Sequence, residues 1–466
     1  MYQKLTEKTI KALEGIVGEE NLIIKPDDME PYAHDEVAEL HHLPEAVARV
    51  HSSSEVSAIL KLAQKELFPV TPRGAGKGLS GGAVPLQGGL VLSLEKMDRT
   101  VEIDKENLMV SVEPGMITGN LQREVETQGL FYPPDPASLD SCSIGGNIAE
   151  NAGGPRAIKY GVTKDYVCGL EVVLPDGTIT RLGGKTVKNV TGYNLIQLLV
   201  GSEGTLAVVT GILLRLLPLP REHVDLLIPF NDFSQAARSV AEIIKNRIVP
   251  AALEFMGQDS VRAVEKLLEK EVPFDDADAQ LLITLDGNDR RTINDDYEHI
   301  GEICLNNGAL DVLVAENTAT RERLWHARKM IIEALQNLSP QRIMDTMDVV
   351  VPRSRLPELL AGIKEVSRNE GLEIISFGHA GDGNVHVNII KNIDEAVWRD
   401  KTPKTVERIY RLALSLGGTI TGEHGVGLTR KRFLSSALDQ CQIDLMKKIK
   451  KDFDPQNILN PGKIFP

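Results

Sequence analysis

One short segment, Phe377 to Asn388, restricts the local fold more than any other part of the chain. It reads FGHAGDGNVHVN, and its three glycines disfavour a helix and predict a tight turn. After the turn, polar and apolar residues alternate, which predicts a strand with His386 and Asn388 on the same face. The segment therefore predicts a turn flanked by two histidines, His379 and His386.

A second polar segment, Gly422 to Gly427, reads GEHGVG and adds Glu423 and His424. The two segments together offer two imidazoles, one carboxylate and a spare histidine. This set suits a divalent metal with an open coordination position, plus a base. The alternative is two unrelated glycine loops that carry ordinary histidines.

Length, charge and cysteine content narrow the class of protein. A chain of 466 residues is too long for one core and predicts two or three domains. A net charge of −14 without a Lys/Arg-rich run argues against a nucleic-acid or anionic-membrane surface. The N-terminus predicts an amphipathic helix rather than a signal peptide, and no apolar run approaches the roughly 20 residues of a membrane span.

The cysteines indicate a reducing compartment, and we expect a cytoplasmic protein. They form no C-x-x-C pair, which argues against a disulfide framework and against an iron–sulfur cluster held by this chain. The four cysteines are Cys142, Cys168, Cys304 and Cys441.

The stretch from Gly74 to Gly89 is the first of two long polar loops, and seven of its sixteen residues are glycine. Such a loop lets backbone N–H groups approach an anion, usually a phosphate, without obstruction by side chains. A second loop runs from Phe131 to Gly161 and is rich in glycine, proline, serine and asparagine. A structureless stretch of that length is usually functional, and it suits a large polar cofactor.

Two nucleotide-binding motifs match parts of the sequence but fail on context. Gly76 to Gly81 fits G-x-G-x-x-G, yet a Rossmann fingerprint must open a helix, and Ala83-Val84-Pro85 followed by a strand excludes one. A P-loop ending at Thr186 would require glycine at position 179, where Ile179 stands. We therefore reject both a Rossmann-type NAD site and a P-loop.

Several motifs in fixed order carry a family resemblance. PRGAGKGLSGG, PPDPAS, SIGGNIAENAGG, VKNVTGYN and GSEGTL resemble the FAD-binding half of the vanillyl-alcohol oxidase superfamily. The later FGHAGDGNVHVN and GEHGVG are similar to segments of FAD-linked 2-hydroxy-acid dehydrogenases, of the D-lactate dehydrogenase and glycolate oxidase D-subunit type. The resemblance extends from about residue 40 to the final NPGKIFP.

The resemblance implies an α+β fold. It comprises a two-subdomain FAD-binding domain over residues 1–220, a cap or substrate domain over 221–415 and a C-terminal segment over 416–466 that returns to the flavin site. The pattern of elements after residue 220 suggests a largely antiparallel sheet in the cap, with helices on one side.

The resemblance also implies that FAD binds in the polar loops, where backbone N–H groups would meet its two phosphates. Many relatives attach FAD through a histidine in the first loop, and Lys77 stands at that position, so we expect non-covalent FAD. The alternative is that these are plain surface loops. The expected cofactor-binding residues are Pro72, Arg73, Gly74, Ala75, Gly76, Lys77, Gly78, Ser80, Gly81, Pro134, Asp135, Ser138, Ser143, Gly145, Gly146, Asn147, Asn151, Gly153, Gly154, Tyr160, Gly161, Glu203, Gly204 and Asn460.

For the metal, the resemblance implies that His379, His386 and Glu423 are ligands and that His424 is the base. Zinc suits these ligands, and iron or manganese remains open. The alternative for His424 is a further ligand. A Lewis acid would stabilise the developing alkoxide while hydride leaves the same carbon for the flavin.

A 2-hydroxy acid carries a carboxylate, and the planar fork of arginine matches that group. Arg328 lies in LWHAR, which resembles the family segment that binds the carboxylate; the alternative is a surface arginine on a helix over residues 320–337. Asn388 is a candidate for a hydrogen bond to the substrate, or else a strand-end amide. Relatives acting on 2-hydroxyglutarate carry a lysine where Thr346 stands, so a small monocarboxylate fits better.

These observations predict an FAD- and metal-dependent D-2-hydroxy-acid dehydrogenase. The leading candidate substrate is D-lactate. Glycolate or D-2-hydroxyglutarate is the alternative substrate. A non-catalytic flavin subunit of a redox complex and a non-redox flavoenzyme of the same fold are the alternative classes. The expected electron acceptor is a partner redox protein, either an electron-transferring flavoprotein or an iron–sulfur subunit.

Overall fold

The computed structural model describes residues 2–37, 39–315, 317–341 and 343–466. The chain forms two compact units. Unit 1 comprises Met1–Gly153, Val162–Leu219 and Glu423–Pro466, and unit 2 comprises Gly154–Gly161 and Pro220–Gly422. Within the described residues, no helix combines the length and the apolar character needed to cross a bilayer.

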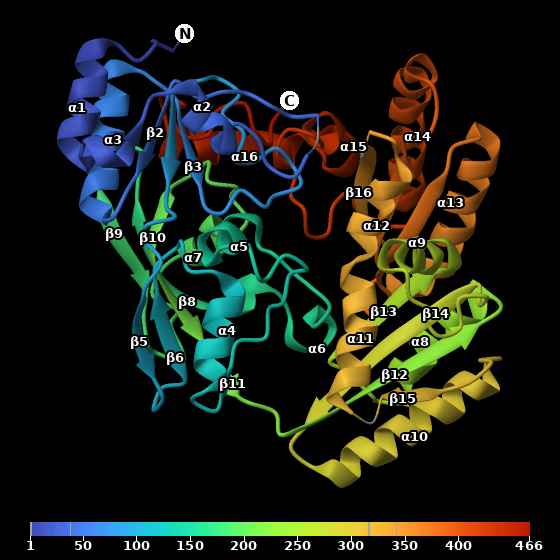
Figure 1. The fold of residues 1–466 in the computed structure, drawn as a ribbon. Helices are drawn as coiled ribbons and strands as arrows, with labels where there is room; N and C mark the ends of the chain where they lie inside the picture. The colour runs from blue at the N-terminus through green and yellow to red at the C-terminus, as the bar shows by residue number, and fades with distance from the viewer. Residues whose placement is uncertain (1, 38, 316, 342) are drawn as a thin grey trace. The chain divides into compact units, whose positions relative to one another are not determined.

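Unit 1 begins with a four-stranded sheet of order β1-β2-β4-β3. Strands β2 and β3 both pair with β4 in parallel, and β1 is antiparallel to β2. Helices α1 and α3 lie side by side and pack their apolar faces on the sheet (Figure 1). The bounds are α1 Glu7–Val17, β1 Leu22–Ile23, α2 Pro26–Met29, β2 Ala46–Arg49, α3 Ser53–Glu66, β3 Val70–Arg73 and β4 Leu90–Ser93.

The second sheet of unit 1 is antiparallel, with the strand order β5-β6-β10-β8-β9. A two-stranded ribbon of β7 and β11 accompanies it. The bounds are β5 Thr100–Asp104, β6 Met109–Val112, α4 Thr118–Glu126, β7 Leu130–Phe131, α5 Ile144–Glu150, β8 Val167–Val173, β9 Ile179–Gly183, α7 Leu195–Leu199, β10 Val208–Arg215 and β11 Leu217–Pro218. The C-terminal part of the chain adds α15 Leu434–Ala437 and α16 Gln440–Phe453.

Unit 2 is built on a seven-stranded sheet of order β15-β12-β14-β13-β17-β18-β16, in which every neighbouring pair is antiparallel. The strands are β12 Glu222–Phe230, β13 Ala252–Gly257, β14 Ala279–Gly287, β15 Leu313–Ala315, β16 Met344–Val350, β17 Ile374–His379 and β18 Asn384–Ile390. The helices are α6 Ala157–Tyr160, α8 Phe233–Lys245, α9 Gln258–Leu268, α10 Arg290–Asn306, α11 Thr318–Lys329, α12 Ile331–Leu338, α13 Leu356–Glu370 and α14 Glu395–Ser415. An α+β fold with a largely antiparallel cap sheet is thereby confirmed.

The expectation of helices on one side of this sheet is wrong. Met256 of β13 belongs to a core shared with α9, α11 and α12. Its neighbour Phe255 points to the opposite face and meets Phe233 of α8, with ring centroids 5.3 Å apart. The physical reason is that the central strands are buried along their whole length, as in β18, so both faces require cover.

The single helix expected over residues 320–337 is also divided. Helix α11 ends at Lys329 and α12 begins at Ile331. Met330 between them has φ −79° and ψ −3°, which is far from the helical ψ of about −42°.

The predicted turn between the two histidines is a hairpin that joins β17 to β18. The register pairs Phe377 with His386 and His379 with Asn384. Gly383 closes the turn with φ +76°, and a Cβ there would lie 2.1 Å from the carbonyl oxygen of Val351. The position therefore requires glycine for both backbone conformation and space.

We expect Gly383→Ala to destabilise unit 2 far more than Gly371→Ala. Gly371 has a similar φ of +64° but open space around its missing Cβ. Gly371→Ala should lower the free energy of unfolding by only about 1–2 kcal/mol, the cost of alanine in the left-handed conformation. Gly383→Ala adds a backbone clash, for which we expect at least about 1–3 kcal/mol more. Denaturant unfolding of both variants measures the difference, and equal losses would contradict this account of the turn.

Candidate functional site

His379 and His386 lie on the same face of the unit 2 sheet, because paired residues of antiparallel strands point to the same side. Both are buried, and their Nε2 atoms are 3.3 Å apart. Two nitrogen ligands at about 2.05 Å from a tetrahedral metal are separated by about 3.3 Å. The chain thus brings the two predicted histidine ligands of unit 2 to a separation that suits one metal ion.

Glu254 on β13 orients His379, and sequence reasoning missed it. Its Oε1 lies 2.7 Å from His379 Nδ1, and its side chain is fully buried. A carboxylate here accepts, so Nδ1 carries the proton and Nε2 presents its lone pair to His386. Burial raises the pKa of Glu254, but its contacts with His379 and Arg328 outweigh burial and hold the pKa below its usual value.

Arg328 on α11 completes this chain of contacts. Its Nε and Nη2 donate to Glu254 Oε2 at 3.0 and 2.6 Å, and its guanidinium lies 4.7 Å from the centre of the Phe377 ring. Arg328 is buried, so it is not a surface arginine. Only Nη1 lacks a hydrogen bond within the described residues, which leaves one nitrogen rather than the whole fork for a substrate carboxylate.

Asp348 on β16, also missed, supports His386 and the next polar segment. Its Oδ1 lies 3.7 Å from His386 Nδ1 and accepts from Asn384 Nδ2 at 2.7 Å. Its Oδ2 accepts from the Gly422 N–H at 2.9 Å and from Thr421 Oγ1 at 3.0 Å. Asp348 therefore fixes the last residues of unit 2, and Glu423 is the next residue along the chain.

Asn388 and Thr346, which we assigned to substrate choice, are bonded to one another. Thr346 Oγ1 donates to Asn388 Oδ1 at 3.0 Å, and Asn388 Nδ2 lies 3.3 Å from the Ile375 carbonyl oxygen. Asn388 is fully buried on the strand that carries His386. The Asn388 side chain thus forms hydrogen bonds to the neighbouring strands of the sheet.

In unit 1, residues 423–427 contact two side chains, Glu203 from the GSEGTL motif and Arg430. The Val426 and Gly427 N–H groups donate to Glu203 at 2.8 and 2.7 Å. Arg430 Nη2 lies 3.3 Å from His424 Nδ1. A guanidinium only donates, so Nδ1 of His424 accepts and the neutral ring carries its proton on Nε2.

Glu423 faces the second glycine loop within unit 1. A Cβ at Gly153 would lie 2.7 Å from Glu423 Oε1. Gly153 is one of the expected cofactor-binding residues, and its lack of a side chain leaves space for this carboxylate. A side chain at position 153 would displace the Glu423 carboxylate from this position.

A buried acidic cluster lies under the same segment of unit 1. Burial and the neighbouring Glu203 hold the pKa of Glu150 well above 4.5, and burial raises that of Glu203 and Asp35. Lys463, from the terminal NPGKIFP, donates to the carbonyl of Gly81 and to that of Val84. Burial lowers the pKa of Lys463 to about 8, against the raising charges of these acids.

The two glycine-rich loops meet in unit 1, as a shared cofactor site would require. The Ala75 N–H donates to Ser143 Oγ at 3.3 Å, and a Cβ at Gly74 would lie 2.3 Å from the same oxygen. Asn460 donates to the carbonyls of Gly82 and Glu203. The segments Arg73–Gly82 and Ser143–Gly153, the second of which includes α5, are thus close in space.

Other expected cofactor residues have structural partners. Arg73 donates to the carbonyl oxygens of His34 and Pro31. Lys77 forms an ion pair of 2.6 Å with Glu36. Gly154, Tyr160 and Gly161 fall in unit 2, where the Tyr160 hydroxyl donates to Asp286 at 2.8 Å.

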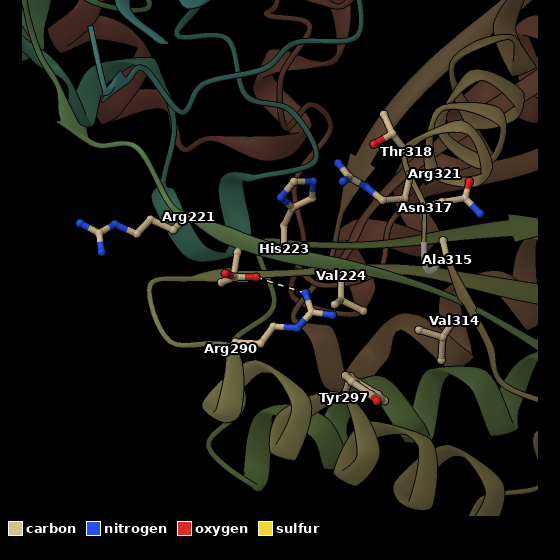
Figure 2. Close-up of a pocket in the computed structure, with 11 residues that line it drawn as sticks. Arg221, His223, Val224, Arg290, Tyr297, Val314, Ala315, Asn317, Thr318 and Arg321 are labelled. Atoms are coloured by element: carbon tan, nitrogen blue, oxygen red, sulfur yellow. Dashed lines mark hydrogen bonds and ion pairs between the residues drawn. The ribbon is translucent and has the colours of Figure 1, made fainter. Parts of the chain in front are cut away.

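Unit 2 also contains a cavity of about 580 Å³ at the start of β12 and α11. Figure 2 shows the Arg321 guanidinium extending toward the His223 ring, and Arg290 paired with Glu222. Burial first, and then the charge of Arg321, lower the pKa of His223. None of the candidate catalytic or metal residues lines this cavity.

Comparison with known proteins identifies the family to which the chain belongs. A profile described as FAD binding domain matches residues 44–183, and one described as FAD linked oxidases, C-terminal domain, matches residues 219–464. The glycolate oxidase subunit GlcD of Bacillus subtilis (strain 168) is 42% identical over 434 residues, which cover 93% of this chain and 92% of the relative. The D-lactate dehydrogenase of Anaerostipes hadrus is 38% identical over 470 residues, covering 99% and 98%.

A solved structure of p-cresol methylhydroxylase with substrate bound has a TM-score of 0.81 at 17% identity, covering 100% of this chain and 98% of that one. The two profiles define an FAD-linked oxidoreductase, and its fold is that of this vanillyl-alcohol oxidase-type structure. The chain belongs to the D-lactate dehydrogenase and glycolate oxidase D-subunit family, so the predicted resemblance is confirmed.

We expect Glu150→Gln to gain stability relative to the unaltered chain as the pH rises. The raised pKa means that folded Glu150 holds a proton which the unfolded chain releases above about pH 4.5, so its contribution falls with rising pH. An amide cannot ionise and removes this loss. Thermal midpoints from about pH 5 to about pH 8 measure the effect, with exposed Glu106→Gln as the control. A constant difference between the unaltered chain and Glu150→Gln would contradict the assignment.

Proposed function

We propose that this protein is an FAD- and metal-dependent dehydrogenase that oxidises a small D-2-hydroxy acid, most readily D-lactate, to the 2-oxo acid. The observation that carries the proposal is the buried pair of Nε2 atoms of His379 and His386, 3.3 Å apart, with Glu254 on the outer nitrogen of His379. A carboxylate on the far nitrogen of an imidazole is the usual support of a metal-ligating histidine. The named activities of the relatives agree with it.

The ligand chemistry favours a divalent metal held by His379, His386 and Glu423. Glu423 follows Gly422, whose N–H is fixed by Asp348, the residue that also faces His386. Two nitrogens and one oxygen suit zinc, and they also suit iron or manganese. The chain belongs to an FAD family, and Lys77 engaged with Glu36 supports non-covalent binding of the flavin.

In the mechanism, bound FAD would accept hydride, and the bound cation would act as a Lewis acid on the substrate hydroxyl. The chain's own groups bind and orient the substrate. Arg328 offers Nη1 to its carboxylate, and the buried neutral Asn388–Thr346 pair brings no second positive charge. This absence of a second charge favours a monocarboxylate over a dicarboxylate.

His424 would take the hydroxyl proton while hydride leaves the same carbon, so the substrate loses two electrons and two hydrogens in all. Its Nδ1 faces Arg430 in the structure, and Nε2 therefore carries the proton of the neutral ring. Acceptance of a substrate proton requires that contact to be exchanged for the substrate.

The two electrons must leave the flavin for turnover, and we propose a partner redox protein as the acceptor. The sequence lacks a Rossmann pattern for NAD and a cysteine set for an iron–sulfur cluster. Glycolate is the second candidate substrate, favoured by the 42% identity to a glycolate oxidase subunit.

The test of the proposed function is anaerobic flavin reduction across D- and L-2-hydroxy acids. We expect D-lactate to bleach the flavin absorbance fastest, glycolate more slowly, and D-2-hydroxyglutarate and L-lactate hardly at all. A chelator should abolish the bleaching, and added Zn²⁺ or Mn²⁺ should restore it. If no 2-hydroxy acid bleaches the metal-loaded protein, the chain is not such a dehydrogenase.

We expect the metal and the base to be separable by mutation. His386→Ala should lose bound metal and flavin reduction together, because it removes one nitrogen of the 3.3 Å pair. His424→Asn should keep the metal and slow flavin reduction by about a hundred- to ten-thousandfold, the usual contribution of a positioned base. Metal analysis and stopped-flow absorbance measure both. Loss of metal from His424→Asn would make His424 a ligand.

A further inference from the structure

Three side chains from three different elements of unit 2 form a chain of contacts that ends at His379. Arg328 comes from α11, Glu254 from β13 and His379 from the end of β17. The contacts run from Arg328 to Glu254 Oε2 and from Glu254 Oε1 to His379 Nδ1. All three side chains are at least nine-tenths buried, so water does not compete for these bonds.

We propose that Glu254, locked by Arg328, is a positioning residue that holds His379 in its Nδ1–H tautomer and so keeps Nε2 available as a metal ligand. The inference rests on the proposed function only in its assignment of Nε2 as a metal ligand. The tautomer itself follows from the acceptor chemistry of the carboxylate, because an ionised carboxylate accepts and never donates.

Arg328 is needed because Glu254 alone would be a costly buried charge. An ionised carboxylate buried without a partner would neutralise, and a protonated carboxyl group can donate as well as accept. The two hydrogen bonds from Arg328 keep Glu254 ionised. Arg328 thus acts on the metal site through Glu254, in addition to any contact of Nη1 with substrate.

Replacing Glu254 with glutamine reverses the tautomer for a geometric reason. The amide oxygen must face Arg328, since the guanidinium has only donors and is permanently charged. The amide NH₂ then faces His379 Nδ1 and donates to it. His379 must therefore carry its proton on Nε2, the atom that faces His386, and metal ligation by Nε2 is blocked.

The chain supplies a matched control in Asp225 and Arg321. Asp225 on β12 is buried and accepts from Arg321 Nε, seven residues before Arg328 on α11, at 3.0 Å. Its other oxygen accepts from Trp325 Nε1 at 3.2 Å, and Arg321 lines the cavity of Figure 2. Asp225→Asn also replaces a buried carboxylate that pairs with an α11 arginine, but it touches no histidine of the pair.

The first measurement is nitrogen-15 NMR of [¹⁵N]histidine-labelled, metal-free protein above the usual histidine pKa, with His379→Gln to assign the signal. The unaltered chain and Asp225→Asn should show His379 as the Nδ1–H tautomer, and Glu254→Gln should show the Nε2–H tautomer. The unaltered chain alone can contradict the proposal, because an Nε2–H tautomer of His379 in it would overturn the assignment. The test therefore holds even if Glu254→Gln folds poorly.

The second measurement is metal affinity, by competition of Zn²⁺ with a coloured chelator. Glu254→Gln should weaken binding by about 10- to 100-fold, the usual loss for such a partner, and Asp225→Asn should bind within about twofold of the unaltered chain. Equal losses in the two variants would make the effect one of general stability and overturn the positioning role. If the unaltered chain shows the expected tautomer but binds no metal, the proposed metal site fails and the tautomer assignment stands.

Discussion

The buried contact between Glu254 and His379 is the constraint on which the candidate site depends. A carboxylate and a guanidinium inside unit 2 carry a desolvation cost of several kcal/mol each, which their mutual attraction offsets only with good geometry. Glu254 meets that condition, because both of its oxygens accept hydrogen bonds from charged or ring N–H groups. Well-packed apolar residues would stabilise such a position as well or better, so the charge is understood through what it does to His379.

In unit 1, the end of the chain and the glycine-rich loops hold each other in place. Asp454 accepts from the Ile458 and Leu459 N–H groups at 3.0 and 2.8 Å and so shapes the last turn before NPGKIFP. Lys463 and Asn460 then bind carbonyls at the first glycine loop, and Glu203 binds the amides of GEHGVG. The flexible sequences that predicted a cofactor are thereby fixed by buried polar side chains, which is how glycine-rich backbone can be both open and ordered.

The sequence predicted the parts that periodicity and glycine spacing control. These include the hairpin that carries His379 and His386, the first glycine-rich loop and the antiparallel cap sheet. The second polar stretch, expected to lack structure, contains α5 and α6. The sequence did not predict Glu254, although Glu254 is a lone carboxylate in an apolar strand, ALEFMG, and such a residue requires a buried partner. It did not predict Asp348 either, which shares β16 with Asp345. The partner cannot be read from the sequence, because Arg328 lies 74 residues from Glu254 and meets it only through the packing of α11 on the sheet. The cover on both faces of that sheet was missed for the same reason.

His379 and His424 differ in the charge of the side chain that contacts their Nδ1 atom, which is a carboxylate for His379 and a guanidinium for His424. His379 has a carboxylate on Nδ1, so its Nε2 is a lone pair suited to a cation. His424 has a guanidinium on Nδ1, so its Nε2 carries a proton and repels a cation. Sequence spacing makes the two imidazoles equivalent candidates for ligand or base, and only their partners distinguish them. Because each partner belongs to the same unit as its histidine, the contact that orients each ring lies within that unit.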